Sequence, residues 1–345
     1  MHDARVLVVD DSAAMRALFC DVLEQAKNVR VVGTAASAAE ARDKIEELLP
    51  NVLTLDVEMP GMSGIDFLEE IMTHKPIPVI MLSSLTQSGT ETSLRAYELG
   101  AVECFPKPLK ATPEQFAKTV GKLGKIVVAA ANANVRERGG ARQREPKPDA
   151  EAPFTWNGHY VAMSASMGGI DALTKLLADY PSRCPPTVIV LNTDPALAEA
   201  FIARMDADAR CSIKAARDGA ALTPGTVFIA ADPNHHVVLE AGQPAKLRLV
   251  ARDPVDGARP SATLLFASLA RAEVPAVGAV LTGTGLDGAK GLKLMRDASC
   301  DTFAQSLASA TVPEAPQAAI EAGAVQREIA LEEMCAEVLK CCNVG

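Results

Sequence analysis

The sequence has no apolar stretch of the roughly 18 or more residues that a transmembrane helix needs, and its opening MHDARVLVVDD lacks a signal peptide's apolar region. C-x-x-C spacing is also absent among the eight cysteines, which lie at positions 20, 104, 184, 211, 300, 335, 341 and 342. These absences predict a cytoplasmic protein with reduced thiols. Any association with a membrane would be indirect, through a protein partner.

Positively charged residues are also few: the sequence has 34 Lys and Arg against 43 Asp and Glu, which gives a net charge of −9. This balance argues against a dominant surface for nucleic acid or anionic lipid and favours protein or small-molecule partners. The 345 residues are 48% hydrophobic, which is enough for two domains with proper cores and excludes disorder throughout.

The first third of the chain alternates buried-strand and amphipathic-helix patterns, and five such units are complete by about residue 121. Acidic residues stand at the carboxyl ends of two predicted strands, Asp10 and Asp11 after the first and Asp56 after the third. The carboxyl ends of parallel strands share one edge, so the three carboxylates should meet there and need a cation such as Mg²⁺. Ser83 and Lys107 end two further strands and suit phosphate oxygens.

These residues resemble a response-regulator receiver domain, which has a flavodoxin-like fold. The resemblance implies that Asp56 accepts a phosphoryl group. It also implies the surrounding ligands, namely Asp10, Asp11, Asp56 and the Glu58 carbonyl for Mg²⁺, and Ser83 and Lys107 for the phosphoryl group. The alternative is an acidic edge of an ordinary flavodoxin-like domain, which five agreeing positions disfavour.

Two details concern the strand that ends at the lysine. The resemblance implies a cis peptide bond at Lys107-Pro108, an isomer found mainly before proline. Receiver domains usually carry a switch aromatic three residues before the lysine, where this chain has Cys104 with Phe105 beside it. The way in which phosphorylation of the receiver is transmitted to the rest of the protein should therefore differ from the usual pattern.

A change in composition separates two domains. From about Gly124 to Pro153 the sequence mixes charges with glycine and proline and has almost no large apolar residues, which predicts a flexible linker. We expect a receiver domain at 1–121, a linker at 122–153 and a second α/β domain at 154–345.

The second domain opens on strand, tight turn and helix patterns from Tyr160 to Leu177, with Ser166 in the turn before Gly168 and Gly169. A serine there lies at a strand's carboxyl end, close to helix N-terminal amides that can stabilise an oxyanion. This arrangement suits a nucleophile, although a tight packed turn is an equally simple interpretation.

Further strand patterns at 187–191, 226–231, 277–282 and 302–305 predict a doubly wound, mostly parallel sheet. The loops NTDP (192–195) and GTGLDG (283–288) should lie at the same edge as Ser166. GTGLDG also matches a dinucleotide-binding fingerprint, but it falls late in the domain and no acid for a ribose follows. Asp287 is better interpreted as an acid that orients a catalytic base.

The receiver, the linker and the motifs ASMGG, ARPSA, LTGTGLDG and FAQS together resemble the chemotaxis family of protein-glutamate methylesterases and protein-glutamine glutaminases. In that family a Ser-His-Asp triad hydrolyses methyl esters on chemoreceptor glutamates, and the receiver controls access. The resemblance implies Ser166 as nucleophile, Asp287 as acid and the backbone amide of Thr284 at the oxyanion site.

The triad histidine has no counterpart, since the family's Gln-His-Met-Pro corresponds to Asn192-Thr193-Asp194-Pro195 and puts Thr193 at the base position. Threonine cannot accept a proton near neutral pH. His159 begins its strand roughly 20 Å from Ser166, which excludes it. His235 and His236 follow another strand and are the candidates for a relocated base.

Two functions remain open. The first is a phosphorylation-regulated methylesterase and glutamine deamidase, of full or weakened activity, with a chemotaxis histidine kinase and methyl-accepting chemoreceptors as partners. The second is a non-catalytic adaptor that accepts phosphoryl groups and binds receptors without hydrolysing them.

Overall fold

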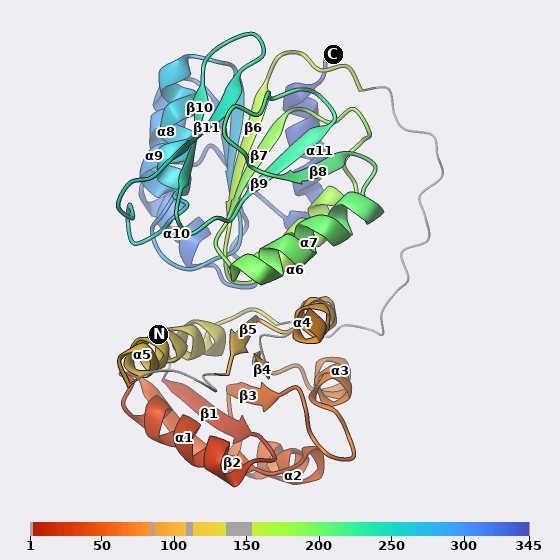
Figure 1. Ribbon diagram of the computed structural model, residues 1–345, viewed down its shortest axis with the longest axis vertical. Coiled ribbons are helices and arrows are strands. Elements are labelled where there is room, and N and C mark those ends of the chain that lie inside the picture. Colours follow the sequence, from red (N-terminus) through yellow and green to blue (C-terminus); the bar gives the residue numbers. More distant parts are fainter. Residues whose placement is uncertain (1–2, 84–86, 108–112, 136–153, 345) are drawn as a thin grey trace. The chain divides into compact units, whose positions relative to one another are not determined.

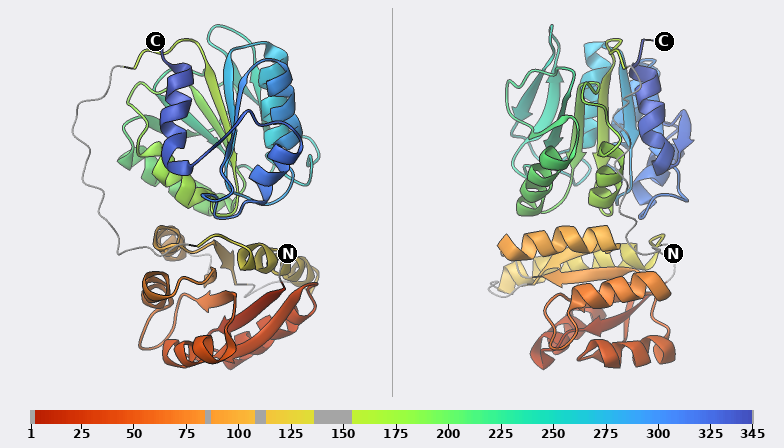
Figure 2. Two further views of the ribbon diagram at one scale, coloured as in Figure 1. Left: turned by 180° about the vertical axis from the view of Figure 1, so that it is seen from behind. Right: turned by 90° about the vertical axis from the view of Figure 1, so that its right-hand side faces the viewer.

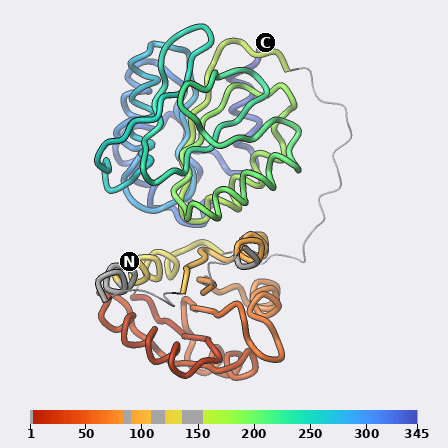
Figure 3. The backbone as a smooth tube through the Cα atoms, viewed as in Figure 1, coloured from red at the N-terminus to blue at the C-terminus, as the bar shows by residue number. Residues whose placement is uncertain are grey.

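The computed structural model describes residues 3–83, 87–107, 113–135 and 154–344. The chain divides into two compact units, Met1–Gln143 and Arg144–Gly345, which follow one another in sequence from red to yellow and from green to blue (Figure 3). Within the described ranges, no helix combines the length and apolar character needed to cross a membrane.

The first unit is a parallel five-stranded sheet in the order β2-β1-β3-β4-β5 with helices on both faces (Figure 1). Its elements are β1 (Ala4–Val9), α1 (Ala13–Glu24), β2 (Val29–Ala35), α2 (Ala38–Leu48), β3 (Val52–Asp56), α3 (Gly64–His74), β4 (Val79–Ser83), α4 (Gln87–Leu99), β5 (Glu103–Pro106) and α5 (Pro113–Ala131). The expected flavodoxin-like arrangement of five strand–helix units is confirmed.

Local sequence explains the helix starts in this unit. Ser12, Ser37 and Ser63 each accept a backbone hydrogen bond from the residue three positions on, which satisfies an amide of the first turn. Apolar residues of α2, α3 and α4 form one core with strands β1, β3 and β4.

The end of this unit differs from the expectation. We expected a linker from residue 122, but α5 continues to Ala131. Leu123, Val127 and Ala130 recur at helical spacing and are buried, so packing extends the helix beyond the predicted boundary. The change in composition that marks the linker begins after this apolar stripe.

The second unit contains a seven-stranded parallel sheet in the order β14-β13-β12-β6-β7-β9-β8 and a separate antiparallel hairpin, β10-β11. Its elements are β6 (Tyr160–Ala165), α6 (Gly169–Leu177), β7 (Thr187–Leu191), α7 (Pro195–Asp208), β8 (Ser212–Ala215), β9 (Thr226–Ala230), β10 (His236–Glu240), β11 (Lys246–Val250), α8 (Ala262–Ala272), β12 (Ala276–Val280), α9 (Ala289–Asp297), β13 (Asp301–Gln305), α10 (Glu314–Glu321), β14 (Arg327–Ile329) and α11 (Leu331–Cys342). The expected doubly wound, mostly parallel sheet is confirmed.

Helices cover both faces of this sheet. Seen from behind, α11 in dark blue and the light-blue pair α8 and α9 lie on opposite sides of the strands (Figure 2). The core on the α8 side also includes buried residues of the β10-β11 hairpin. The sequence patterns missed this hairpin because its strands mix buried and exposed positions instead of forming continuous apolar runs.

Parallel pairing aligns the strand ends that carry chemistry. Ala165 pairs with Leu191, and Ser164 pairs with Val280. The loops after β6, β7 and β12 therefore begin at one edge of the sheet, as the sequence predicted.

Candidate functional site

Three carboxylates gather at the carboxyl edge of the first sheet. One oxygen from each of Asp10, Asp11 and Asp56 lies within 4.8 Å of the others. Asp10 and Asp56 are buried, whereas Asp11 is exposed. An all-oxygen donor set with an open side fits Mg²⁺, which keeps several of its waters. The predicted meeting of the three acids is confirmed.

Lys107 supplies the positive charge at this edge. Its Nζ lies 2.9 Å from Asp10 Oδ2 and 2.7 Å from Asp56 Oδ2. Burial raises the pKa of Asp56 above its ordinary value, while the Lys107 ammonium acts in the opposite direction. The Glu58 amide donates to Asp56 Oδ1 at 3.2 Å. A carboxylate that is desolvated but paired with a cation is suited to nucleophilic chemistry at phosphorus.

Ser83 joins the same edge. Lys107 donates its backbone amide to the Ser83 carbonyl at 2.9 Å, which holds the ends of β4 and β5 together. The Ser83 hydroxyl lies 3.4 Å from the Ser93 hydroxyl of α4. The Lys107-Pro108 peptide bond lies outside the described residues, so the cis isomer stays a prediction.

Cys104, which stands where receiver domains usually carry an aromatic residue, contacts α4 in two ways. Its backbone amide donates to the Tyr97 hydroxyl at 3.0 Å, and its thiol donates to the Ser93 carbonyl at 3.7 Å. The Tyr97 hydroxyl in turn donates to Glu103, and burial raises the pKa of both groups. Sequence reasoning missed this network, although the tyrosine seven residues before the cysteine was its available signal.

In the second unit, the turn after β6 holds Ser166 against the loop after β12. The Thr284 amide donates to Ser166 Oγ at 3.0 Å, and the Ser166 amide donates to the Thr282 carbonyl at 3.1 Å. A side chain at Gly283 would place its Cβ 2.2 Å from Ser166 Oγ, so only glycine allows this approach. Gly168 has φ +75° and is the N-cap of α6. The structure therefore brings the predicted nucleophile and the predicted oxyanion donor together.

The Asp287 carboxylate is hydrogen-bonded to the start of α8, whereas the sequence predicted an acid that orients a catalytic base. Its carboxylate accepts hydrogen bonds from the Ser261 hydroxyl at 2.6 Å, the Ala262 amide at 2.7 Å and the Thr263 amide at 3.1 Å. The GLDG turn thus directs the carboxylate to the N-terminus of α8, where amides and the helix dipole favour negative charge. None of the hydrogen bonds found among the described residues joins Asp287 to a histidine or to Ser166.

Thr193 lies half-buried in the short connection from β7 to α7, where Asp194 accepts the amides of Ala196 and Leu197 as the N-cap. The relocated-base alternatives have other partners. His235 Nδ1 lies 2.6 Å from Asp232 Oδ2. Among the described residues, no histidine is hydrogen-bonded to Ser166.

His236 is buried, and both of its ring nitrogens are engaged. Nδ1 accepts the Ser261 amide at 3.1 Å, so Nε2 carries the proton and donates to the Asp253 carbonyl at 3.0 Å. The imidazole therefore joins β10 to two points of the connection between β11 and α8. Its role in positioning Ser261 was not visible in the sequence.

The two units match different families. The response regulator receiver domain profile matches residues 6–119, and the CheB methylesterase profile matches residues 161–338. A protein-glutamate methylesterase/protein-glutamine glutaminase 1 from Caulobacter vibrioides is 45% identical, with 98% of each chain covered. A protein-glutamate methylesterase/protein-glutamine glutaminase 2 from Pseudomonas aeruginosa is 38% identical over 97% of this chain and 96% of its own.

A solved structure adds evidence on the fold. The Thermotoga maritima CheB methylesterase catalytic domain superposes with a TM-score of 0.51 at 24% identity, covering 53% of this chain and 98% of that chain. At this identity the likeness concerns the fold alone, and it agrees with the parallel α/β architecture of the second unit.

Proposed function

The chain belongs to the CheB methylesterase family with a response regulator receiver domain ahead of the methylesterase domain, and from this premise we propose that it hydrolyses glutamate methyl esters, and deamidates glutamines, on chemoreceptors through Ser166. The observation that carries the proposal is the 3.0 Å hydrogen bond from the Thr284 amide to Ser166 Oγ. This contact supports Ser166 as the nucleophile and the Thr284 amide as the oxyanion donor.

In this reaction Ser166 Oγ attacks the ester carbonyl. The carbonyl oxygen becomes negatively charged and accepts a hydrogen bond from the Thr284 amide. Collapse of the tetrahedral intermediate releases methanol, and water then hydrolyses the acyl-enzyme to free glutamate. A glutamine side chain would release ammonia instead. Each cycle needs a group that removes the serine proton and returns it to the leaving group.

The residue at the family's base position cannot perform this proton transfer, so we infer a slow esterase. Thr193 occupies the base position and cannot accept a proton near neutral pH. Asp287 is already hydrogen-bonded by three donors. Loss of a triad histidine can cost on the order of a millionfold in turnover, although the oxyanion site and substrate binding leave residual catalysis.

Thr193 at the base position and the three hydrogen bonds to Asp287 also favour a second candidate, a non-catalytic adaptor that binds receptors and signals through its receiver. The two candidates separate in one experiment. Methylated receptor membranes would be incubated with the parent protein and with Ser166→Ala, and both methanol release and co-sedimentation would be measured. Release that depends on Ser166 supports the esterase. Co-sedimentation without release above the Ser166→Ala level supports the adaptor.

Control by phosphorylation belongs to the proposal in either case. Asp56 would accept the phosphoryl group from a chemotaxis histidine kinase, with Ser83 and Lys107 holding its oxygens. Mg²⁺ would be held by Asp10, Asp11, Asp56 and the Glu58 carbonyl, and when bound it neutralises the charge of the phosphoryl oxygens. Lys107, 2.7 Å from Asp56, would keep the acceptor ionised in its buried site.

Labelling tests this part of the proposal. Acetyl phosphate should label the parent in the presence of Mg²⁺ and leave Asp56→Asn unlabelled, whereas Asp66→Asn on α3 should behave as the parent. Equal labelling of Asp56→Asn would show that the acceptor lies elsewhere. The division into a receiver domain, a linker and a methylesterase-like domain at 154–345 also remains part of the proposal, with the end of the receiver moved from residue 121 to the end of α5 at Ala131.

A further inference from the structure

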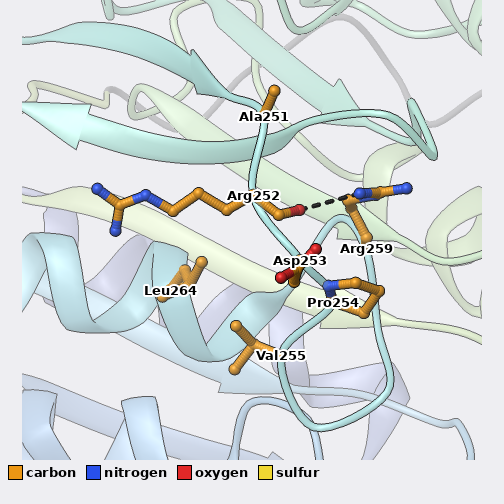
Figure 4. Close-up of a pocket in the computed structure, with 7 residues that line it drawn as sticks. All are labelled: Ala251, Arg252, Asp253, Pro254, Val255, Arg259 and Leu264. Atoms are coloured by element: carbon orange, nitrogen blue, oxygen red, sulfur yellow. Dashed lines mark hydrogen bonds between the residues drawn. The ribbon is translucent and has the colours of Figure 1, made fainter.

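A cavity of about 740 Å³ lies beside the first turn of α8, between that helix and residues 251–259 that follow β11 (Figure 4). We propose that this cavity is a second contact site for the substrate, which binds a free carboxylate side chain of the receptor segment that carries the methylated glutamate. The inference rests on the proposed function, since it names what the substrate must offer besides the ester.

The walls of the cavity are pre-formed. Val255 and Ala258 exchange both backbone hydrogen bonds across a tight turn, at 3.0 and 2.9 Å. The Asp253 carbonyl accepts His236 Nε2 at 3.0 Å, and Lys290 Nζ lies 2.6 Å from Asp256. A cavity whose loop is held from several sides needs little ordering when a ligand binds, which favours affinity.

Two arginines, Arg252 and Arg259, line the cavity and supply its positive charge. Arg259 donates Nε to the Pro233 carbonyl at 2.5 Å and Nη1 to the Arg252 carbonyl at 2.9 Å, so its guanidinium is fixed in place. The Arg252 side chain extends on the other side, above Leu264 (Figure 4). Among the described residues, neither guanidinium forms an ion pair with a carboxylate. The described residues that line the cavity include two arginines and one acid, Asp253, so together they carry net positive charge.

This local charge contrasts with the chain as a whole, which has a net charge of −9. Guanidinium groups bind carboxylates through two parallel hydrogen bonds, and the apolar side chains of Val255 and Leu264 suit the methylene stem of a glutamate. An acidic peptide side chain fits both the charge and the apolar wall. Its methyl ester, which has no charge, would not be held in the same way.

The cavity is joined to the proposed nucleophile through the start of α8. Leu264 lines the cavity, and Ser261, three residues earlier, donates its hydroxyl to Asp287 at 2.6 Å. Asp287 belongs to the same short loop as Thr284, whose amide donates to Ser166. Two segments, the start of α8 and the loop after β12, therefore link the lining of the cavity to Ser166 through hydrogen bonds. The proposal requires a substrate that contacts both places, held by a carboxylate at one and attacked at the other.

Binding of two synthetic helical peptides tests the inference. Each carries one glutamate methyl ester and a fluorescent label. One has glutamates one and two turns to either side, and the other has glutamines there. With the full chain, Arg252→Ala should weaken binding of the glutamate peptide about tenfold, which corresponds to roughly 1.4 kcal/mol. Binding of the glutamine peptide should not change.

The matched control is Arg248→Ala on β11. It removes the same charge from an exposed arginine that pairs with Asp218 and Glu240 instead of lining the cavity, and both peptides should bind it as they bind the parent. The Arg252 side chain makes no hydrogen bond within the described residues, so its removal should leave the fold intact.

Three results would overturn the inference: equal losses for Arg252→Ala and Arg248→Ala, equal losses for the two peptides, or no binding of the glutamate peptide by the parent at millimolar concentration. Hydrolysis is scored separately. Arg252-dependent binding without ester hydrolysis refutes the esterase but not the site, whereas Ser166-dependent hydrolysis that Arg252→Ala leaves unchanged in KM and kcat refutes the site but not the esterase.

Discussion

Replacing Thr193 by histidine should convert this protein into a better esterase, because it places an imidazole in the connection after β7, at the same sheet edge as Ser166. The proposed nucleophile and the proposed oxyanion donor are already in contact, at 3.0 Å from the Thr284 amide to Ser166 Oγ. The missing function is proton transfer. A positioned general base contributes about 10²- to 10⁴-fold in rate.

The gain should fall at the low end of that range because of Asp287. Its carboxylate has about four lone-pair positions, and three are used by Ser261, Ala262 and Thr263. A new imidazole would compete for the remaining one and would be poorly oriented. We therefore expect a gain of about 100-fold, or roughly 2.7 kcal/mol in the activation free energy.

The assay is methanol release from a peptide that carries a glutamate methyl ester, at a series of pH values. Thr193→His should show a rate that rises as its imidazole loses a proton, near pH 6.5 for an unperturbed histidine. Thr193→Gln, a polar residue that cannot act as a base, is the matched control and should stay at the parent rate. Adding Ser166→Ala to Thr193→His should abolish the gain.

Several outcomes would refute the reasoning. A gain that survives Ser166→Ala would show that Ser166 is not the nucleophile. Strong activity of the parent that disappears with His235→Ala would reveal a relocated base. No gain from Thr193→His, although the peptide binds, would mean that the region around Ser166 no longer supports a triad, and the adaptor would then be the better interpretation.

Three further predictions follow from the same contacts. Asp11→Asn should weaken Mg²⁺ binding about tenfold or more, measured by calorimetry, because an exposed carboxylate of the acidic cluster is lost; unchanged affinity would place the metal elsewhere. Gly283→Ala should prevent labelling by a serine-reactive fluorophosphonate while the protein stays folded by circular dichroism, because the new Cβ would lie 2.2 Å from Ser166 Oγ, and undiminished labelling would contradict this geometry. Burial raises the pKa of Glu103, so its protonated form stabilises the receiver at low pH, and this contribution is lost as pH rises from the unfolded-state pKa through the folded-state pKa. Glu103→Gln, which can still accept the Tyr97 hydroxyl, should remove that part of the pH dependence in urea unfolding, and an unchanged profile would count against the raised pKa.

Much of this molecule was determined by the sequence alone. Continuous apolar runs that end in Asp10, Asp56 and Ser83 predict buried parallel strands, and parallel strands must deliver their carboxyl ends to one edge. The meeting of the acids with Lys107, and of Ser166 with the loop of Thr284, follows from that topology. Local patterns were sufficient because each residue's place depends on the end of its own strand.

The limits of sequence reasoning lie in contacts that only packing creates. The extension of α5 to Ala131 depends on burial of its apolar stripe. The β10-β11 hairpin belongs to no parallel sheet, so its mixed pattern gave a weak signal. The link from Cys104 to Tyr97 joins a strand to the helix before it, and no periodicity predicts a hydrogen bond of this kind.

The same division applies to the catalytic question. From the sequence alone, Thr193 replaces a base and Asp287 is an acid at the end of a glycine-rich turn. Only the tertiary structure decided that Asp287 accepts three hydrogen bonds from the start of α8 and that His236 is held between Ser261 and Asp253. Sequence spacing fixes which strand end a side chain leaves from, but the direction of a short polar side chain is set by the donors that distant segments bring beside it.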